Sequence, residues 1–280
     1  MTTLKKVTTL KELRDARAAL PEPVALVPTM GYLHAGHLSL VERARREAAS
    51  VVVSIFVNPT QFAPTDDLDA YPRDLARDSA LLADAGADLL WTPTPEVMYP
   101  PGYQTWVEVE EITKPLEGAK RPGHFRGVTT VVTKLFNAVQ PQVAVFGQKD
   151  AQQAAVIRRM VRDLNMPVEI ITSPIVREAD GLAMSSRNTY LNPAERKAAL
   201  VLSKSLAAAR SAYEKGERNA DTLRAMMEEI IRAEPLARLD YVSVADNDSL
   251  AELQRIEGKT LLSMAVYIGT TRLIDNAVLG

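Results

Sequence analysis

The chain has 280 residues, of which 46% are hydrophobic and 24% charged, a composition typical of a globular protein with one or two domains. Its 33 lysines and arginines nearly balance 35 aspartates and glutamates, and the resulting net charge of −2 provides no general attraction to nucleic acid or to an acidic membrane. The lack of cysteine excludes disulfides, thiolate catalysis and cysteine-ligated zinc.

The N-terminal stretch has no feature of a secretory signal. Lys5 and Lys6 are not followed by an apolar signal core, and no apolar run in the chain reaches the length of a membrane span. We therefore expect a cytoplasmic protein without a membrane or nucleic-acid partner.

Strands and helices alternate in the predicted order through about residue 175. Continuous apolar runs predict strands buried on both faces, and apolar residues three or four positions apart predict the helices. In chain order the predicted elements are a helix over residues 9–20, a strand over 24–27, a helix from His37, a strand over 51–57, a helix from Pro72 to about Ala85, a strand over 88–91, a helix over 128–139, a strand over 143–146, a helix from Lys149 and a strand over 168–171. This alternation predicts an α/β fold with a doubly wound, Rossmann-like parallel sheet.

The pattern changes in the last third of the chain. Two helices come first and are followed by strands, an order that predicts a small α+β domain. The predicted elements are a helix that begins after Asn192 and extends toward Gly216, a helix over residues 220–233, and strands over 241–244, over 261–268 and near Leu273. We expect a larger Rossmann-like domain over residues 1–178 and a smaller C-terminal lid domain over residues 179–280.

The most informative stretch lies between the first buried strand and the helix that follows it. Residues 28–40 read P-T-M-G-Y-L-H-A-G-H-L-S-L, in which two glycines permit a tight turn and the helix N-terminus offers free N–H groups to an anion. His34 and His37 are three residues apart, so both imidazoles can donate a hydrogen bond to the same phosphate group. Ordinary core or solvated histidines are the alternative, but two glycines and a preceding strand favour an anion site.

Further polar groups follow other predicted strands. Asn58 and Gln61 come after the strand that ends near residue 57, where an open α/β sheet binds its ligands. Lys149 lies in a Gly-Gln-Lys-Asp stretch after the strand over 143–146, and Arg187 lies in a Met-Ser-Ser-Arg-Asn stretch. A glycine-bracketed segment with Arg121 and His124 adds more positive charge.

Together these groups suit a reaction at a phosphate. Negative charge spreads over the phosphate oxygens in the transition state, and lysine, arginine, histidine and serine can all stabilise it. Solvated surface charge is the alternative for Lys149 and Arg187, and for the acidic loop over residues 66–71 it is the better interpretation. Carboxylates of that loop are otherwise candidates to bind Mg²⁺ near phosphates.

The H-x-G-H stretch resembles the nucleotide-binding motif of the adenylyl-transferring Rossmann-like superfamily, which includes class I aminoacyl-tRNA synthetases. A more specific resemblance, to the pantothenate synthetase family, spans about residues 24 to 192. The motifs that carry it are M-G-x-L-H-x-G-H at 30–37, F-V-N-P-x-Q-F at 56–62, Y-P-R at 71–73, G-H-F-R-G-V at 123–128, G-x-K-D at 147–150 and M-S-S-R-N at 184–188.

The resemblance implies an ATP-dependent ligase that condenses pantoate with β-alanine through a pantoyl adenylate and releases AMP and pyrophosphate. His37 is then a proton donor and His34 binds phosphate beside it, with Lys149 and Arg187 as the other catalytic residues. The residues implied to hold ATP are Met30, Gly31, Tyr32, Leu33, His34, Ala35, Gly36, His37, Gly147, Gln148, Lys149, Asp150, Val176, Met184, Ser185, Ser186 and Arg187. The expected substrate-binding residues are Gln61, Gln153, Asn58, Arg121 and His124. The family uses Mg²⁺ with ATP and usually forms homodimers.

Two other functions remain open from the sequence. A nucleotidyltransferase would leave the nucleotide on its product, whereas a ligase needs a second substrate and releases free AMP. A non-catalytic nucleotide-binding protein would bind ATP without releasing pyrophosphate. The two histidines, Lys149 and Arg187 argue against the second alternative.

Overall fold

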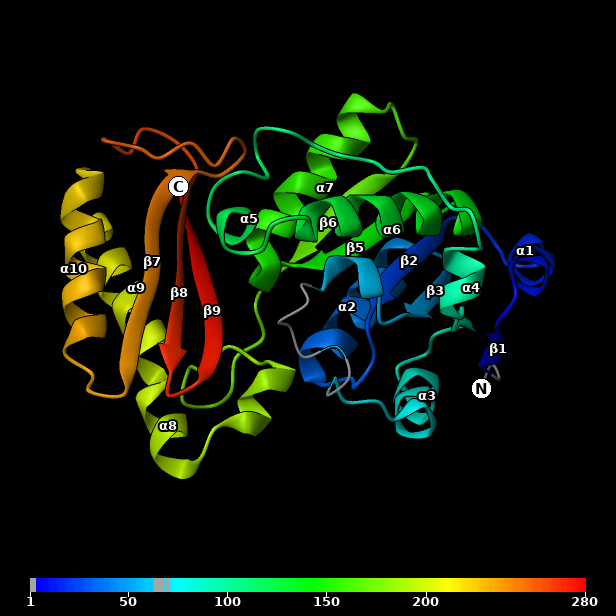
Figure 1. The fold of residues 1–280 in the computed structure, drawn as a ribbon, viewed down its shortest axis with the longest axis horizontal. Coiled ribbons are helices and arrows are strands. Elements are labelled where there is room, and N and C mark those ends of the chain that lie inside the picture. Colours follow the sequence, from blue (N-terminus) through cyan, green and yellow to red (C-terminus); the bar gives the residue numbers. More distant parts are fainter. Residues whose placement is uncertain (1–3, 63–67, 69–70) are drawn as a thin grey trace. The chain divides into compact units, whose positions relative to one another are not determined.

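A computed structural model describes residues 4–62, 68 and 71–280 (Figure 1). The chain divides into two compact units. The N-terminal unit comprises Met1–Gly147 and Val156–Pro174, and the C-terminal unit comprises Gln148–Ala155 and Ile175–Gly280. This division differs from the predicted boundary between residues 178 and 179, above all because Gln148–Ala155 belongs with the C-terminal unit.

The N-terminal unit contains a six-stranded sheet in which every pair of neighbours is parallel, as the sequence predicted. The strand order is β1-β4-β3-β2-β5-β6. The strands are β1 (Lys5–Val7), β2 (Val24–Thr29), β3 (Ser50–Ile55), β4 (Leu89–Trp91), β5 (Val143–Gly147) and β6 (Glu169–Ser173). Strand β1 was not predicted from the sequence, because three residues are too few to show an apolar period.

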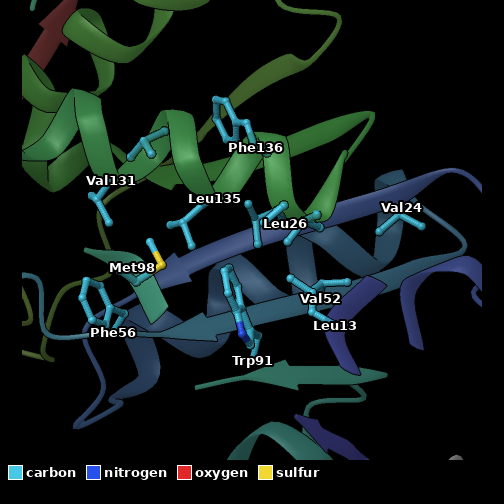
Figure 2. Close-up of a cluster of buried hydrophobic side chains, with 14 of the residues drawn as sticks. Leu13, Val24, Leu26, Val52, Phe56, Trp91, Met98, Val131, Leu135 and Phe136 are labelled. Carbon is cyan, nitrogen blue, oxygen red and sulfur yellow. The ribbon is translucent and has the colours of Figure 1, made fainter. Parts of the chain in front are cut away.

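Helices cover both faces of this sheet, so the predicted doubly wound α/β arrangement is confirmed. Buried side chains of α2 (Ala35–Glu47) and α3 (Leu75–Asp84) form the core on one face. The other face packs against α1 (Leu10–Ala18), α6 (His124–Val139) and α7 (Ala151–Asp163). Figure 2 shows this second core, in which strand residues Leu26, Val52 and Trp91 lie beside Val131, Leu135 and Phe136 of α6.

The strand order places a switch point between β2 and β5. These two strands are parallel neighbours, with Ala25 opposite Val143 and Leu26 opposite Ala144. From β2 the chain continues to β3 on one side, whereas β5 is followed by β6 on the other side. Ligands of open α/β sheets bind outside the carboxyl ends of the strands at such a point. The turn that follows β2 therefore lies at the expected ligand-binding edge.

Several predicted helix limits were wrong. Helix α3 begins at Leu75 and not at Pro72, because Asp74 accepts a hydrogen bond from the Arg77 N–H and caps the helix. Helix α6 begins at His124 and not at residue 128, after Gly123 in the left-handed conformation with φ of 81°. The long helix predicted after Asn192 is two helices, α8 (Pro193–Ala198) and α9 (Leu200–Glu214).

The C-terminal unit contains an antiparallel sheet in the order β7-β8-β9, which confirms the predicted α+β character. Its strands are β7 (Ala237–Asp246), β8 (Thr260–Ile268) and β9 (Thr271–Leu279). Helices α9 and α10 (Ala220–Arg232) pack on one face of the sheet and form a single apolar core with it (Figure 1).

The remaining elements are short: α4 (Pro95–Met98), α5 (Glu117–Lys120) and the 3₁₀ turns η1 (Pro59–Gln61), η2 (Gln148–Asp150) and η3 (Ser186–Tyr190). No helix among the described residues is both long and apolar enough to cross a membrane.

Candidate active site

The turn after β2 is held in shape by a buried carboxylate from another helix. Asp78 of α3 is 1% exposed, and its two oxygens accept hydrogen bonds from the backbone N–H groups of Tyr32 at 2.7 Å and Leu33 at 2.8 Å. Gly31 and Tyr32 both have positive φ, of 86° and 51°. The positive φ favours glycine at position 31, and a β-carbon there would also lie tightly, 3.0 Å from a methyl group of Ile55.

His34 and His37 cap the N-terminus of α2 reciprocally. The ring Nδ1 of His34 accepts a hydrogen bond from the Gly36 N–H at 3.1 Å, and Nδ1 of His37 accepts one from the His34 N–H at 3.3 Å. The ring centroids are 4.1 Å apart. Since each Nδ1 is an acceptor, each neutral ring carries its proton on Nε2. The cap thus places two adjacent imidazoles at a helix N-terminus, where an anion is favoured.

Gln61 lies beside this turn in the same unit. Its side-chain Nε2 contacts Met30 Sδ at 3.2 Å, and its Oε1 accepts a hydrogen bond from Asn58 Nδ2 at 3.0 Å. Asn58 is 1% exposed, and its Oδ1 accepts a hydrogen bond from the Tyr99 hydroxyl at 2.8 Å. Burial raises the pKa of Tyr99 above its usual value of 10, which keeps this donor protonated at neutral pH. Asn58 therefore orients the Gln61 side chain.

The structure places Arg121 and His124 on the backbone of Gln61. His124 Nδ1 donates to the Gln61 carbonyl oxygen at 2.8 Å, and an Arg121 N–H reaches the same oxygen at 3.4 Å. Gly127 lies on the other side of this turn, where a β-carbon would lie 2.6 Å from the Thr60 carbonyl carbon. The backbone of η1 can contact α6 this closely only because residue 127 is glycine.

Lys149 and its neighbours are part of the C-terminal unit. Lys149 lies in η2, with its side chain 21% exposed and its Nζ 3.8 Å from an Asp150 carboxylate oxygen. Gln148 and Lys149 are attached to β9 through the side chain of Asn276. Gln153 follows in the first turn of α7 and is half-buried. Gly147 is the last residue of β5 and belongs to the N-terminal unit.

The predicted nucleotide residues between 176 and 187 are brought together by a hairpin. The Met184 N–H donates to the Val176 carbonyl oxygen at 3.0 Å, and Arg177 pairs with Ala183 in an antiparallel bridge. Ser185 then caps η3 by accepting a hydrogen bond from the Arg187 N–H at 3.3 Å. Val176, eight positions before Met184 in sequence, is therefore bonded to the first residue of the Met-Ser-Ser-Arg stretch.

Comparison with known proteins gives consistent matches over the whole length. The family model described as pantoate-beta-alanine ligase matches residues 2–278. The chain belongs to the pantoate–β-alanine ligase family. A pantothenate synthetase from Roseiflexus sp. (strain RS-1) is 62% identical over 276 residues, 99% of both chains. The predicted family resemblance is therefore confirmed.

Two solved structures of this ligase family share the fold. The pantothenate synthetase of Thermus thermophilus has a TM-score of 0.93 at 52% identity, covering 98% of this chain and 99% of that one. A pantoate–β-alanine ligase from Francisella tularensis, described as complexed with beta-gamma ATP and β-alanine, has a TM-score of 0.78 at 34% identity, covering 98% of this chain and 97% of that one.

The ligase residues predicted from sequence fall into the two units. The N-terminal unit contains Met30–His37, Asn58, Gln61, Arg121, His124 and Gly147, and the C-terminal unit contains Gln148–Asp150, Gln153, Val176 and Met184–Arg187. The carboxylates of the acidic loop, Asp66, Asp67 and Asp69, lie outside the described residues. Within the described residues, no three histidine, aspartate or glutamate side chains gather into a metal site.

Two polar residues of this ligase escaped the sequence analysis. Asp78 lies within a predicted helix, and Asn276 lies near the end of the chain, where no motif was recognised. Both side chains are buried and bond to backbone groups of the site segments. The signal that could have found them is weak: a lone polar residue at an otherwise apolar position, which by itself does not reveal its partner.

Replacing Asp78 by asparagine is expected to destabilise the turn after β2. Asparagine has one oxygen in place of two, so one of the two N–H groups that Asp78 now bonds would face an amide NH₂. An unsatisfied buried donor costs about 1–3 kcal/mol, and we expect the free energy of unfolding, measured with urea, to fall by about that amount.

The matched control is Asp74→Asn, one turn earlier in the same helix. Asp74 caps α3, and asparagine caps helices equally well, so this variant should keep the stability of the wild type. Equal stability of the two variants would show that Asp78 does not hold the turn.

Proposed function

We propose that the chain catalyses the ATP-dependent condensation of pantoate with β-alanine to pantothenate. The observation that carries the proposal is the reciprocal cap of His34 and His37 after the carboxyl end of β2, in a chain of the pantoate–β-alanine ligase family. The Francisella ligase described with beta-gamma ATP and β-alanine supports the same pair of ligands here.

The reaction has two steps. The pantoate carboxylate attacks the α-phosphate of ATP, which forms pantoyl adenylate and releases pyrophosphate. The amine of β-alanine then attacks the activated carbonyl, and AMP leaves with the carboxylate oxygen that pantoate contributed. Both steps need groups that stabilise charge on the phosphate and hold the reactants in place.

In this proposal the Nε2–H groups of His34 and His37 donate hydrogen bonds to the phosphate oxygens. His37 is also the proton donor. The other residues of the turn proposed to hold the nucleotide are Met30–Leu33, Ala35 and Gly36. Lys149 acts as a point charge and Arg187 as a bidentate donor, and Ser185 and Ser186 add hydroxyl donors. The other residues proposed to line the nucleotide are Gly147, Gln148, Asp150, Val176 and Met184.

Gln61 and Gln153 bind pantoate in this proposal. Asn58 contributes by orienting the Gln61 side chain, since both polar ends of its buried amide are hydrogen-bonded to protein groups. Arg121 and His124 contribute by holding the Gln61 carbonyl. Asn58, Arg121 and His124 therefore contribute to substrate binding in this proposal by fixing the position of Gln61.

Mg²⁺ is proposed to enter with ATP. This ion is commonly bound by substrate phosphates together with one or two carboxylates. Asp150, half exposed beside Lys149, is the carboxylate of the nucleotide set that can serve as a ligand. When bound, the ion neutralises phosphate charge. A homodimer, a cytoplasmic location and a lid role for the C-terminal unit complete the proposal.

An isotope experiment tests the reaction. Pantoate carrying heavy oxygen in its carboxylate should yield AMP with one label, and AMP should form only when ATP, pantoate and β-alanine are all supplied for turnover. Without β-alanine, pyrophosphate should appear in an amount close to that of the enzyme. Unlabelled AMP or ADP as the product would contradict the mechanism. A nucleotidylated product would indicate a nucleotidyltransferase, and ATP binding without pyrophosphate would indicate a non-catalytic protein.

A further inference from the structure

Two adjacent buried polar residues on β9 bond to two different segments of the proposed nucleotide set. Asp275 is 2% exposed and Asn276 is 3% exposed, within a strand whose other residues are mainly apolar. Neighbouring residues of a strand point to opposite faces, so the pair can hold two segments at once. All the residues concerned belong to the C-terminal unit.

Both polar atoms of the Asn276 side-chain amide form hydrogen bonds with residues of η2. Its Nδ2 donates to the carbonyl oxygens of Gln148 and Lys149, both at 2.9 Å, and its Oδ1 accepts a hydrogen bond from Gln148 Nε2 at 3.0 Å. These three bonds join Asn276 to two residues that precede it by 127 or 128 positions in the sequence. Directed bonds to both carbonyls define where the backbone of Lys149 lies.

Asp275 holds the other segment. Its two carboxylate oxygens accept hydrogen bonds from the Arg177 guanidinium at 2.7 and 2.9 Å. Arg177 also donates to the Gly181 carbonyl oxygen at 3.0 Å and pairs with Ala183, which precedes the Met-Ser-Ser-Arg stretch. Strand β9 is therefore bonded to η2 on one side and to the 176–184 hairpin on the other.

We infer that Asn276 is a positioning residue for Lys149. Lysine is a flexible point charge, and its effect on a phosphate depends on where its backbone is anchored. A reaction slows when a group that stabilises its transition state is displaced by about 1 Å. The inference rests on the proposed function, in which Lys149 stabilises the phosphate charge as pyrophosphate leaves.

The test compares two half-reactions in Asn276→Asp. This change keeps the size of the side chain but replaces the donating NH₂ by an oxygen that faces two carbonyl oxygens. We expect pantoate-dependent exchange between ATP and pyrophosphate to fall about tenfold or more, and ATP to bind more weakly by calorimetry. Formation of pantothenate from preformed pantoyl adenylate and β-alanine should stay within about twofold of the wild type.

The matched control is Asp240→Asn in the same sheet. Asp240 is also bonded to an arginine, Arg272, at 2.9 and 3.0 Å, and Arg272 lies four positions before Asn276 in β9. This variant should change both half-reactions equally or not at all. If Asn276→Asp does not fold, Asn276→Ser replaces it, because serine removes the amide and introduces no charge.

The outcomes separate positioning from structure. Unchanged exchange and ATP binding in a folded Asn276 variant would overturn the inference, as would an equal fall in both half-reactions. A wild-type protein that shows no pantoate-dependent exchange would contradict the proposed function instead. In that case ATP affinity alone still tests whether Asn276 positions Lys149.

Discussion

Replacing His37 or His34 by alanine is expected to lower kcat by about 10²–10³, the usual cost of removing one donor that stabilises charge in a transition state. The physical reason is that each Nδ1 accepts a backbone hydrogen bond, so that in the proposed mechanism Nε2–H is the group that donates to the phosphate. Steady-state rates with ATP, pantoate and β-alanine measure the effect, and circular dichroism checks that the fold is retained.

Alanine at these positions also removes the cap of α2, so a second variant must separate the two roles. His34→Asn keeps an acceptor for the Gly36 N–H, because asparagine is a favoured N-cap residue, but its amide is too short to replace Nε2. We expect this variant to keep the thermal midpoint of the wild type and to lose activity as His34→Ala does. Near-normal activity of His34→Asn would show that His34 acts only as a cap.

Replacing Lys149 by alanine is expected to lower the rate of adenylate formation by about 10²–10³. The ammonium group is 3.8 Å from a half-exposed carboxylate, a loose pair that leaves its charge available to a phosphate. Amine attack on a finished adenylate does not involve the departure of pyrophosphate. Preformed pantoyl adenylate should therefore restore most of the activity of Lys149→Ala in the second half-reaction.

Lys149→Arg is the control for charge alone. Arginine keeps the charge but has a planar, larger head group, so we expect it to recover part of the exchange rate. Full activity of Lys149→Ala would contradict a role at the phosphate. A loss that preformed adenylate does not relieve would place Lys149 in the second half-reaction.

Local patterns in the sequence were sufficient to predict the fold class. Apolar runs such as Val51–Val53 are fully buried in β3, as continuous runs in a parallel sheet should be. The strand, glycine turn and helix around His34 and His37 appear where the sequence predicted them. Each of these features depends on residues within about ten positions of one another, so a pattern in the chain can reveal it.

The partners of the site segments could be learned only from the tertiary structure. Asp78 bonds to the turn at Tyr32 and Leu33 across 46 and 45 residues, and Asn276 bonds to the backbone of Lys149 across 127 residues. His124 is predicted from the sequence to bind substrate, and the structure adds that its Nδ1 donates to the Gln61 carbonyl oxygen. Such pairs depend on which strands become neighbours and on where each helix begins. Strand order and helix packing are set by the burial of the whole core, which no local period of the sequence encodes.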